Sequence, residues 1–198
     1  MSGQVRARLI GALAMTAGLM ALAAPALAAP ADPSGTYLTE DGRARIRIEK
    51  CGPTRANICG FVVWMKQPMN ERGEPKTDVR NPDPSKTGRR LLGHQLIMGL
   101  KPGDENYQGQ IYNNEDGKSY SVTLWLASSQ TLKVKGCLIA FLCSTQDWTR
   151  TTDTLPGQLA GVTGTADGPT ANPEWAVRPT STGSAATAPH RDARPKTQ

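Results

Sequence analysis

Short runs of alternating apolar and polar residues recur along the chain between residues 35 and 151. From residue 43 to residue 49, alanine or isoleucine at even positions alternates with arginine or glutamate at odd positions. A period of two places neighbouring side chains on opposite faces and is typical of a β-strand with one buried face. Runs of this kind predict strands at residues 35–39, 43–49, 58–66, 94–101, 106–113, 118–127, 131–137 and 145–151.

Two segments depart from simple alternation. The run 58–66 is apolar on both faces, so its periodicity does not say which face is inside. The connection 67–88 is polar, and its Asn-Pro-Asp-Pro sequence at 81–84 excludes a central strand and favours consecutive turns. Long connections in compact domains often have a function. Two interpretations therefore stay open for it, a lid over the mouth of a barrel or an ordered surface loop.

The strands are joined by short turns, and no segment after residue 28 has the periodicity of an amphipathic helix. An antiparallel sheet of short strands exposes its edges unless it closes on itself. The sequence therefore predicts an all-β domain at residues 29–152, an up-and-down antiparallel barrel of about eight strands. A sandwich of two sheets is the alternative.

Residues 1–28 have the three parts of a secretory signal peptide. Arg6 and Arg8 supply the positive charge, residues 9–22 are apolar, and Ala26-Leu27-Ala28 is a small-x-small cleavage site. An uncleaved membrane anchor is disfavoured, because the segment ends in a cleavage motif rather than in flanking charges. We expect cleavage after Ala28, a periplasmic or secreted mature protein, and no membrane span after cleavage.

The composition changes at about residue 153, where Gly, Thr, Ala and Pro become dominant. A segment so poor in apolar residues buries too little surface to offset the entropy of ordering. We therefore expect residues 153–198 to form a low-complexity, disordered tail that can reach an envelope protein or the cell wall. Trp175 is its one aromatic residue and is either a short docking site or incidental.

Basic residues exceed acidic ones, with 23 Lys and Arg against 17 Asp and Glu and a net charge of +6 at pH 7. The excess is spread along the chain, and no Lys/Arg cluster is interleaved with aromatic residues as a nucleic-acid-binding face requires. We interpret the charge as a solvated surface. Weak adhesion to anionic envelope polymers is the sharper alternative.

The four cysteines are Cys51, Cys59, Cys137 and Cys143, an even count that indicates disulfides in an oxidising compartment. Four cysteines can form two disulfides in three different ways. We favour the local one, Cys51 with Cys59 and Cys137 with Cys143, because each pair brackets a segment of the length of a hairpin tip. A cysteine-bound zinc is weakly supported, because the sequence has no C-x-x-C pair.

Four motifs follow one another between Asp32 and Thr151. They are Cys51…Cys59-Gly60; Asp78-x-x-Asn81-Pro82-Asp83-Pro84 with Arg89-x-Leu91-Leu92-Gly93; Gly109-x-Ile111-Tyr112 with Gly117-Lys118-x-Tyr120; and Leu132-x-Val134-x-Gly136 with Gln146-x-Trp148-x-Arg150. In this order they resemble the bacterial envelope family catalogued as domain of unknown function 2147. The resemblance implies a lipocalin-like (calycin) barrel in exported proteins of Gram-negative bacteria and no established activity.

The resemblance also implies a plug at one end of the barrel. In lipocalin-like barrels a Gly-x-Trp ring packs under a basic residue of the last strand. Here Tyr37 stands where that tryptophan is usual, and Arg150 is the basic residue of the last strand. Tyrosine stacks on a guanidinium less strongly than tryptophan. We assign Tyr37, Trp148 and Arg150 to this plug as structural rather than catalytic residues.

Candidate chemistry before residue 153 is sparse. His94 is the single histidine there, and no nucleophile elbow, zinc-protease motif or P-loop is present. Asp78, Asn81, Asp83 and Arg89 lie close together in the sequence. They form either a ligand-binding cluster at the barrel mouth or a set of turn caps in which Arg89 ties the loop to the barrel.

Two hypotheses of function follow. In the first, the barrel binds a small apolar or amphipathic ligand in the cell envelope. In the second, the protein is a structural or interaction protein of the periplasm with a side-chain-filled barrel. An enzyme is a distant third, and no cofactor, metal or oligomeric state is indicated. An internal cavity of about 300 Å³ or more separates the first hypothesis from the second.

Overall fold

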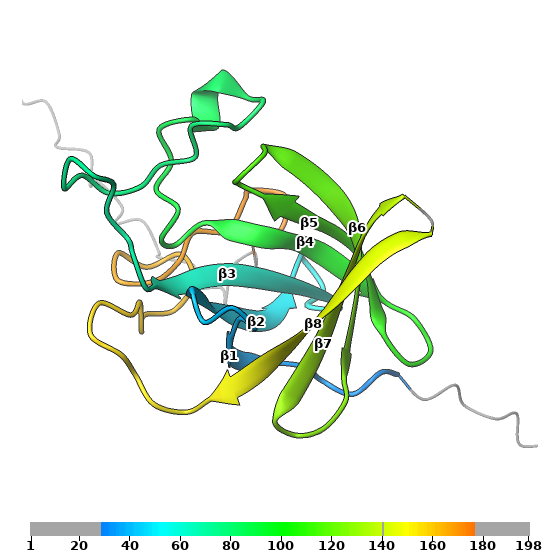
Figure 1. The fold of residues 1–198 in the computed structure, drawn as a ribbon. Helices are drawn as coiled ribbons and strands as arrows, with labels where there is room; N and C mark the ends of the chain where they lie inside the picture. The colour runs from blue at the N-terminus through cyan, green and yellow to red at the C-terminus, as the bar shows by residue number, and fades with distance from the viewer. Residues whose placement is uncertain (1–28, 140, 177–198) are drawn as a thin grey trace, which may run out of the picture.

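The computed structural model describes residues 29–139 and 141–176. Eight strands form one closed antiparallel barrel in sequence order, as Figure 1 shows. The strands are β1 (Gly35–Leu38), β2 (Ala44–Cys51), β3 (Asn57–Met65), β4 (Gln95–Pro102), β5 (Tyr107–Asn113), β6 (Lys118–Leu126), β7 (Thr131–Ile139) and β8 (Leu142–Thr151). The predicted barrel is thus confirmed, and the sandwich is not formed because β1 pairs with β8. The predicted signal peptide lies outside the described residues.

Up-and-down order places alternate connections at opposite ends of the barrel. The β1–β2, β3–β4, β5–β6 and β7–β8 connections lie at one end, here called the open end. The 3-10 helix η1 (Pro84–Lys86) belongs to the long β3–β4 loop at this end. Within the described ranges, no helix has the length and apolar character needed to cross a bilayer.

The opposite end of the barrel is closed by Tyr37 and Arg150, which face each other across β1 and β8. The Arg150 guanidinium carbon lies 4.7 Å from the Tyr37 ring centroid, and the guanidinium also donates to the Tyr37 hydroxyl. Arg150 Nη1 donates to the Ser34 carbonyl oxygen at 2.8 Å. Gly35 has φ +150°, which other residues rarely adopt, and a Cβ there would lie 2.0 Å from Arg150 Nη1 and would displace the guanidinium. These contacts correspond to the plug that the resemblance implied.

Residues 153–176 are not a disordered tail, so that expectation is wrong for this segment. They pack on the outer face of β3, where Leu159, Ala171 and Trp175 cover the buried side chains of Phe61 and Val63 and the Cys51–Cys59 pair. This contact explains why β3 is apolar on both faces. Ile58 and Val62 face the barrel interior, and the other face is buried by the C-terminal segment. The rest of the predicted tail, residues 177–198, lies outside the described part of the chain.

Two arginines of β2 anchor the start of the C-terminal segment. Arg45 is buried and donates to the Asp153 carboxylate at 3.0 Å and to Gln158 Oε1 at 3.0 Å. Arg47 donates to the Gly161 carbonyl oxygen at 2.8 Å. The outward arginine row of β2 therefore holds backbone and side-chain oxygens of a segment that is poor in apolar residues. Such charge-assisted hydrogen bonds replace part of the missing apolar burial.

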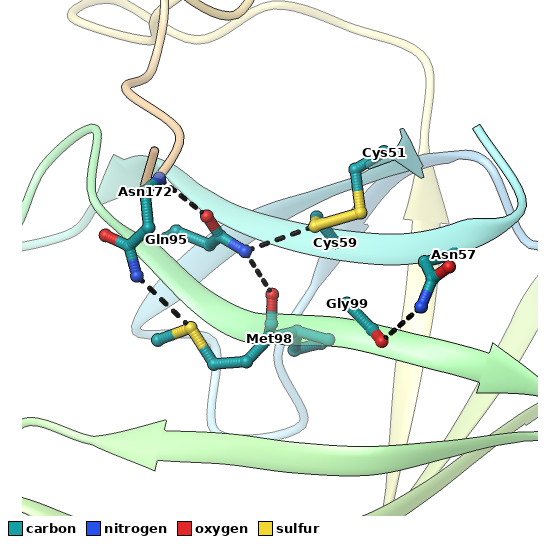
Figure 2. The surroundings of a disulfide bond; sticks show 8 residues. Cys51, Asn57, Cys59, Gln95, Met98, Gly99 and Asn172 are labelled. Carbon is teal, nitrogen blue, oxygen red and sulfur yellow. Dashed lines mark hydrogen bonds between the residues drawn. A yellow bond between two sulfur atoms is a disulfide. The ribbon is translucent and has the colours of Figure 1, made fainter. Parts of the chain in front are cut away.

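Both predicted disulfides are present, Cys51–Cys59 and Cys137–Cys143. The first joins β2 to β3 and lies beneath the C-terminal segment, as Figure 2 shows. Buried Gln95 links this disulfide to the C-terminal segment. Its Nε2 lies 3.1 Å from Cys59 Sγ, and its Oε1 accepts from the Asn172 backbone N–H at 2.8 Å.

The Trp175 ring packs against β4 at Gly99. Gly99 has φ +55°, and a Cβ there would lie 2.2 Å from Trp175 Cζ3. The position therefore needs glycine both for its left-handed backbone and for the close approach of the indole ring. Trp175 is a docking residue rather than an incidental one.

Candidate functional site

The interior of the barrel is hollow toward the open end. Two cavities of about 540 Å³ and 520 Å³ adjoin there, and Gln146 and Trp148 of β8 line both of them. Each volume exceeds the roughly 300 Å³ expected of a small-molecule site. The side-chain-filled interior required by the second hypothesis is therefore absent from this part of the barrel. Trp148, assigned to the plug from the sequence, is buried in the same core cluster as Tyr37 and lines both cavities.

The first cavity has apolar walls and a charged rim. Its walls include Ile46, Val62, Leu91, Leu96 and Trp148, and its rim carries Asp41, Arg43, Lys66, Lys76 and Glu115. The rim cations differ in their partners. Arg43 is paired with Asp41 and Glu115, whereas neither lysine is within ion-pair distance of an acidic side chain of the described residues. Positive charge is therefore uncompensated at this part of the mouth.

The second cavity lies between β5, β6, β7 and β8. Ile111, Val122, Val134 and Leu142 supply apolar walls. Gly136 is decisive for this space, because a Cβ added there would meet no atom within 4 Å. The alternation along β7 turns position 136 to the same side as the buried Leu132 and Val134. An inward position without a side chain leaves room for a ligand.

His94 borders the first cavity and is 3% exposed. Its ring meets the Tyr112 ring edge-on, with centroids 6.2 Å apart, and its Nδ1 is buried without a hydrogen-bond partner. Burial, followed by the positive charge of Arg89, lowers the pKa of His94 to about 4. The imidazole is consequently neutral at pH 7.

This neutral histidine should make the protein sensitive to mild acid. Between pH 6.5 and about 4 the unfolded state binds a proton at His94 that the folded state does not bind. The free energy of unfolding should therefore be highest above pH 6.5 and fall by about 3 kcal/mol as the pH drops to 4. Urea unfolding across this range measures the loss. In His94→Gln the loss should shrink by that amount, and parallel pH profiles of the two proteins would contradict the assignment.

Three of the four loop residues singled out in the sequence meet in one buried cluster. Asp78 is fully buried, and its Oδ2 accepts from Arg89 Nη2 at 2.7 Å and from Asn81 Nδ2 at 2.7 Å. Its Oδ1 accepts from the Tyr112 hydroxyl at 2.6 Å. Asp83 lies apart and caps η1 by accepting from the Ser85 backbone N–H at 3.0 Å. None of the four loop residues lines either cavity.

The electrostatics of this cluster fit a structural tie. Burial raises the pKa of Asp78, but the hydrogen bonds from Tyr112, Asn81 and Arg89 outweigh it and hold the pKa below its usual value. Burial and the hydrogen bond to Asp78 raise the pKa of Tyr112 to about 12. Arg89 Nη1 also donates to Asn172 Oδ1 at 3.3 Å. The ionised carboxylate thus joins the β3–β4 loop, β5 and the C-terminal segment.

Tyr112 was not singled out from the sequence as a partner of Asp78. The alternation of β5 offered the signal, because inward Ile111 leaves its neighbour Tyr112 outward although it is large and aromatic. A large outward aromatic residue on a strand indicates that another segment covers it. Across residues 29–139 and 141–176, no three His, Cys, Asp or Glu side chains gather in a metal-binding arrangement.

A closed eight-stranded barrel with one plugged and one hollow end defines a lipocalin-like fold. The family model described as "Uncharacterized protein conserved in bacteria (DUF2147)" matches residues 35–150, and the chain belongs to this family. The chain is similar in structure to protein HP1028 from Helicobacter pylori, whose solved structure is described as belonging to the lipocalin family. The TM-score is 0.50 at 22% identity, over 61% of this chain and 83% of that one. No curated protein matched the sequence.

Proposed function

We propose that the protein is a non-enzymatic binding protein of the cell envelope that holds a small apolar or amphipathic ligand inside its barrel. The observation that carries this proposal is the pair of adjoining cavities, each above 500 Å³, at the open end. A closed barrel of eight strands is just wide enough for one small ligand. Its apolar walls offer the burial that such ligands gain most from.

The polar groups suggest how the ligand is oriented. Among the polar side chains that line the cavities, His94 is neutral and Gln146 is shared by both. The uncompensated Lys66 and Lys76 lie at the rim of the first cavity. An amphipathic ligand would therefore place its apolar part against Trp148 and its polar or anionic end at the mouth. Part of the β3–β4 loop, at Gln67 and Lys76, borders this mouth and would act as the lid.

An envelope location is supported by the chemistry of the cysteines. Two disulfides tie β2 to β3 and β7 to β8. Disulfides persist in oxidising compartments such as the bacterial periplasm and the extracellular medium. Together with the signal-peptide sequence of residues 1–28, this supports export of the chain to the periplasm or beyond.

Filling the second cavity tests the proposal. Gly136→Trp introduces a large ring into space that contains no atom within 4 Å of the new Cβ, so the barrel should fold while its ligand is excluded. Lys135→Trp is the matched control, because Lys135 is the neighbouring outward-facing residue of β7 and is exposed. Native mass spectrometry of protein purified from the periplasm should show a co-purified small molecule in the wild type and in Lys135→Trp.

In Gly136→Trp the same species should be reduced by at least about tenfold in occupancy, which corresponds to roughly 1.4 kcal/mol of binding free energy. Thermal unfolding confirms that both variants are folded. An identical ligand occupancy in the wild type and in folded Gly136→Trp would contradict binding in the barrel. A wild-type protein that carries no ligand, and that takes up none from an envelope lipid extract, would favour the structural role.

A further inference from the structure

The β7–β8 hairpin ends in an apolar tip that no other described segment covers. Leu138, Ile139, Phe141 and Leu142 are 63%, 52%, 87% and 55% exposed. We define these four side chains as the hairpin tip. Hairpin turns commonly use Gly, Asn and Asp, which are compatible with water and with tight backbone geometry. Four large apolar residues at such a position therefore need a partner surface.

The tip differs from the other exposed apolar side chains of the described residues. Met69 and Val79 are also exposed, but they lie ten residues apart in the β3–β4 loop, and exposed Val162 belongs to the C-terminal segment. Single exposed apolar residues are normal on protein surfaces, whereas contiguous ones mark an interaction site. The Cys137–Cys143 disulfide closes the hairpin directly below the tip, and Cys137 pairs with Cys143 in the strand register. The apolar side chains are thus presented on a braced support.

The position of the tip connects it to the cavities. Leu138 and Leu142 also line the second cavity. The tip is consequently part of the rim of the open end, and Figure 1 shows the β7–β8 hairpin projecting beside β6. Whatever surface the tip contacts therefore lies at the entrance to the barrel.

We propose that the hairpin tip inserts into the apolar layer of an anionic lipid membrane and holds the open end of the barrel against it. The size of the tip favours a bilayer over a protein partner. Four side chains expose a few hundred Å², whereas a standard protein interface needs about 800 Å² from each partner. A bilayer accepts a narrow apolar projection without such an area, because it surrounds the side chains on all sides.

Charge supports the same occupant. Without the predicted signal peptide, which contains Arg6 and Arg8, the chain still has 21 Lys and Arg against 17 Asp and Glu. Exposed Lys135 stands on β7 two residues before Cys137 without an acidic partner among the described residues. Lys118, also exposed, begins the neighbouring strand β6 at the same end of the barrel. Basic residues beside an inserted apolar group are attracted to anionic lipid headgroups. An apolar ligand could then pass between bilayer and cavity without crossing water.

Vesicle binding tests this proposal in the chain from Ala29 to Gln198, which contains every contact described above and omits the apolar segment 9–22. The probe is a vesicle of phosphatidylethanolamine with phosphatidylglycerol. Ile139→Ser with Phe141→Ser should weaken co-sedimentation by at least about tenfold, because two apolar side chains no longer leave water. Val79→Ser with Val162→Ser is the matched control, since it removes equally exposed apolar side chains from other loops and should leave binding unchanged.

Insertion itself is read by Phe141→Trp, whose fluorescence should be quenched by brominated acyl chains in the vesicle. Unquenched fluorescence, or equal binding of the Ile139/Phe141 double variant and the wild type, would overturn the proposal. A dimer in light scattering that the same double variant dissolves would also overturn it and assign the tip to a second copy of the chain. Gly136→Trp leaves the tip intact and should bind vesicles normally, so failure of ligand binding and failure of membrane docking are distinguishable.

Discussion

Ending the chain after residue 152 should lower the free energy of unfolding by at least about 3 kcal/mol. The truncation removes Leu159, Ala171 and Trp175 from the outer face of β3 and exposes Phe61 and Val63 to water. It also deprives buried Arg45 of its partners at Asp153 and Gln158. The melting temperature should fall by about 10 °C, and the exposed face should bind an apolar dye. Differential scanning calorimetry and dye fluorescence measure these effects.

Ending the chain after residue 176 is the matched control. This shorter deletion retains every contact made by residues 153–176 and should change the melting temperature by no more than about 2 °C. Should the chain that ends at 152 not fold, Trp175→Ala gives the same effect in smaller measure, because only the ring against Gly99 is lost. Equal stability of the full chain and the chain ending at 152 would show that the C-terminal segment does not stabilise the barrel.

Asp78→Asn should have the second large effect, a loss of about 3 kcal/mol in the free energy of unfolding. The buried carboxylate accepts three hydrogen bonds, from Tyr112, Asn81 and Arg89. An amide of the same shape offers one acceptor oxygen and turns its NH₂ group toward a donor. The guanidinium of Arg89, which is largely buried, would also lose its counter-ion. Urea unfolding at pH 7 measures the loss.

Asp83→Asn tests whether any acidic residue of this loop would behave in the same way. Asp83 is partly exposed and caps η1, and asparagine caps helices about as well as aspartate. The free energy of unfolding of the Asp83→Asn variant should therefore differ from that of the wild type by no more than about 0.5 kcal/mol. If both variants lost the same stability, the buried cluster around Asp78 would not be the tie between loop and barrel.

The candidate cavities were only partly predictable from the sequence. Alternation placed Val122, Val134 and Ile46 on inward faces, and these residues do line the cavities. It did not reveal that the interior is hollow, because cavity volume depends on how side chains from all eight strands fill the space together. The sequence places Gly136 on an inward face of its strand. Whether this position borders empty space depends on which atoms surround it once the barrel has closed.

The acidic loop shows a different limit. Nearness in sequence grouped Asp78, Asn81, Asp83 and Arg89, and three of them do meet. Asp83 separates from the others because local hydrogen bonding draws it to the start of η1. The partners that complete the cluster come from distant segments. The Tyr112 hydroxyl on β5 donates to Asp78, and Asn172 Oδ1 of the C-terminal segment accepts from Arg89. Contacts over such separations follow from the tertiary fold and leave no periodic trace in the sequence.

The sequence by itself determined the strands, the barrel and the local pairing of the cysteines, because each depends on neighbours within a few residues or on the closure of exposed strand edges. Only the tertiary structure decided the fate of residues 153–176. Their composition predicts disorder in isolation, yet the second apolar face of β3 and the arginine row of β2 supply the burial and hydrogen bonds that order them. The apolar excess of β3 was the sequence signal for a covering segment, and only the folded chain shows which segment it is.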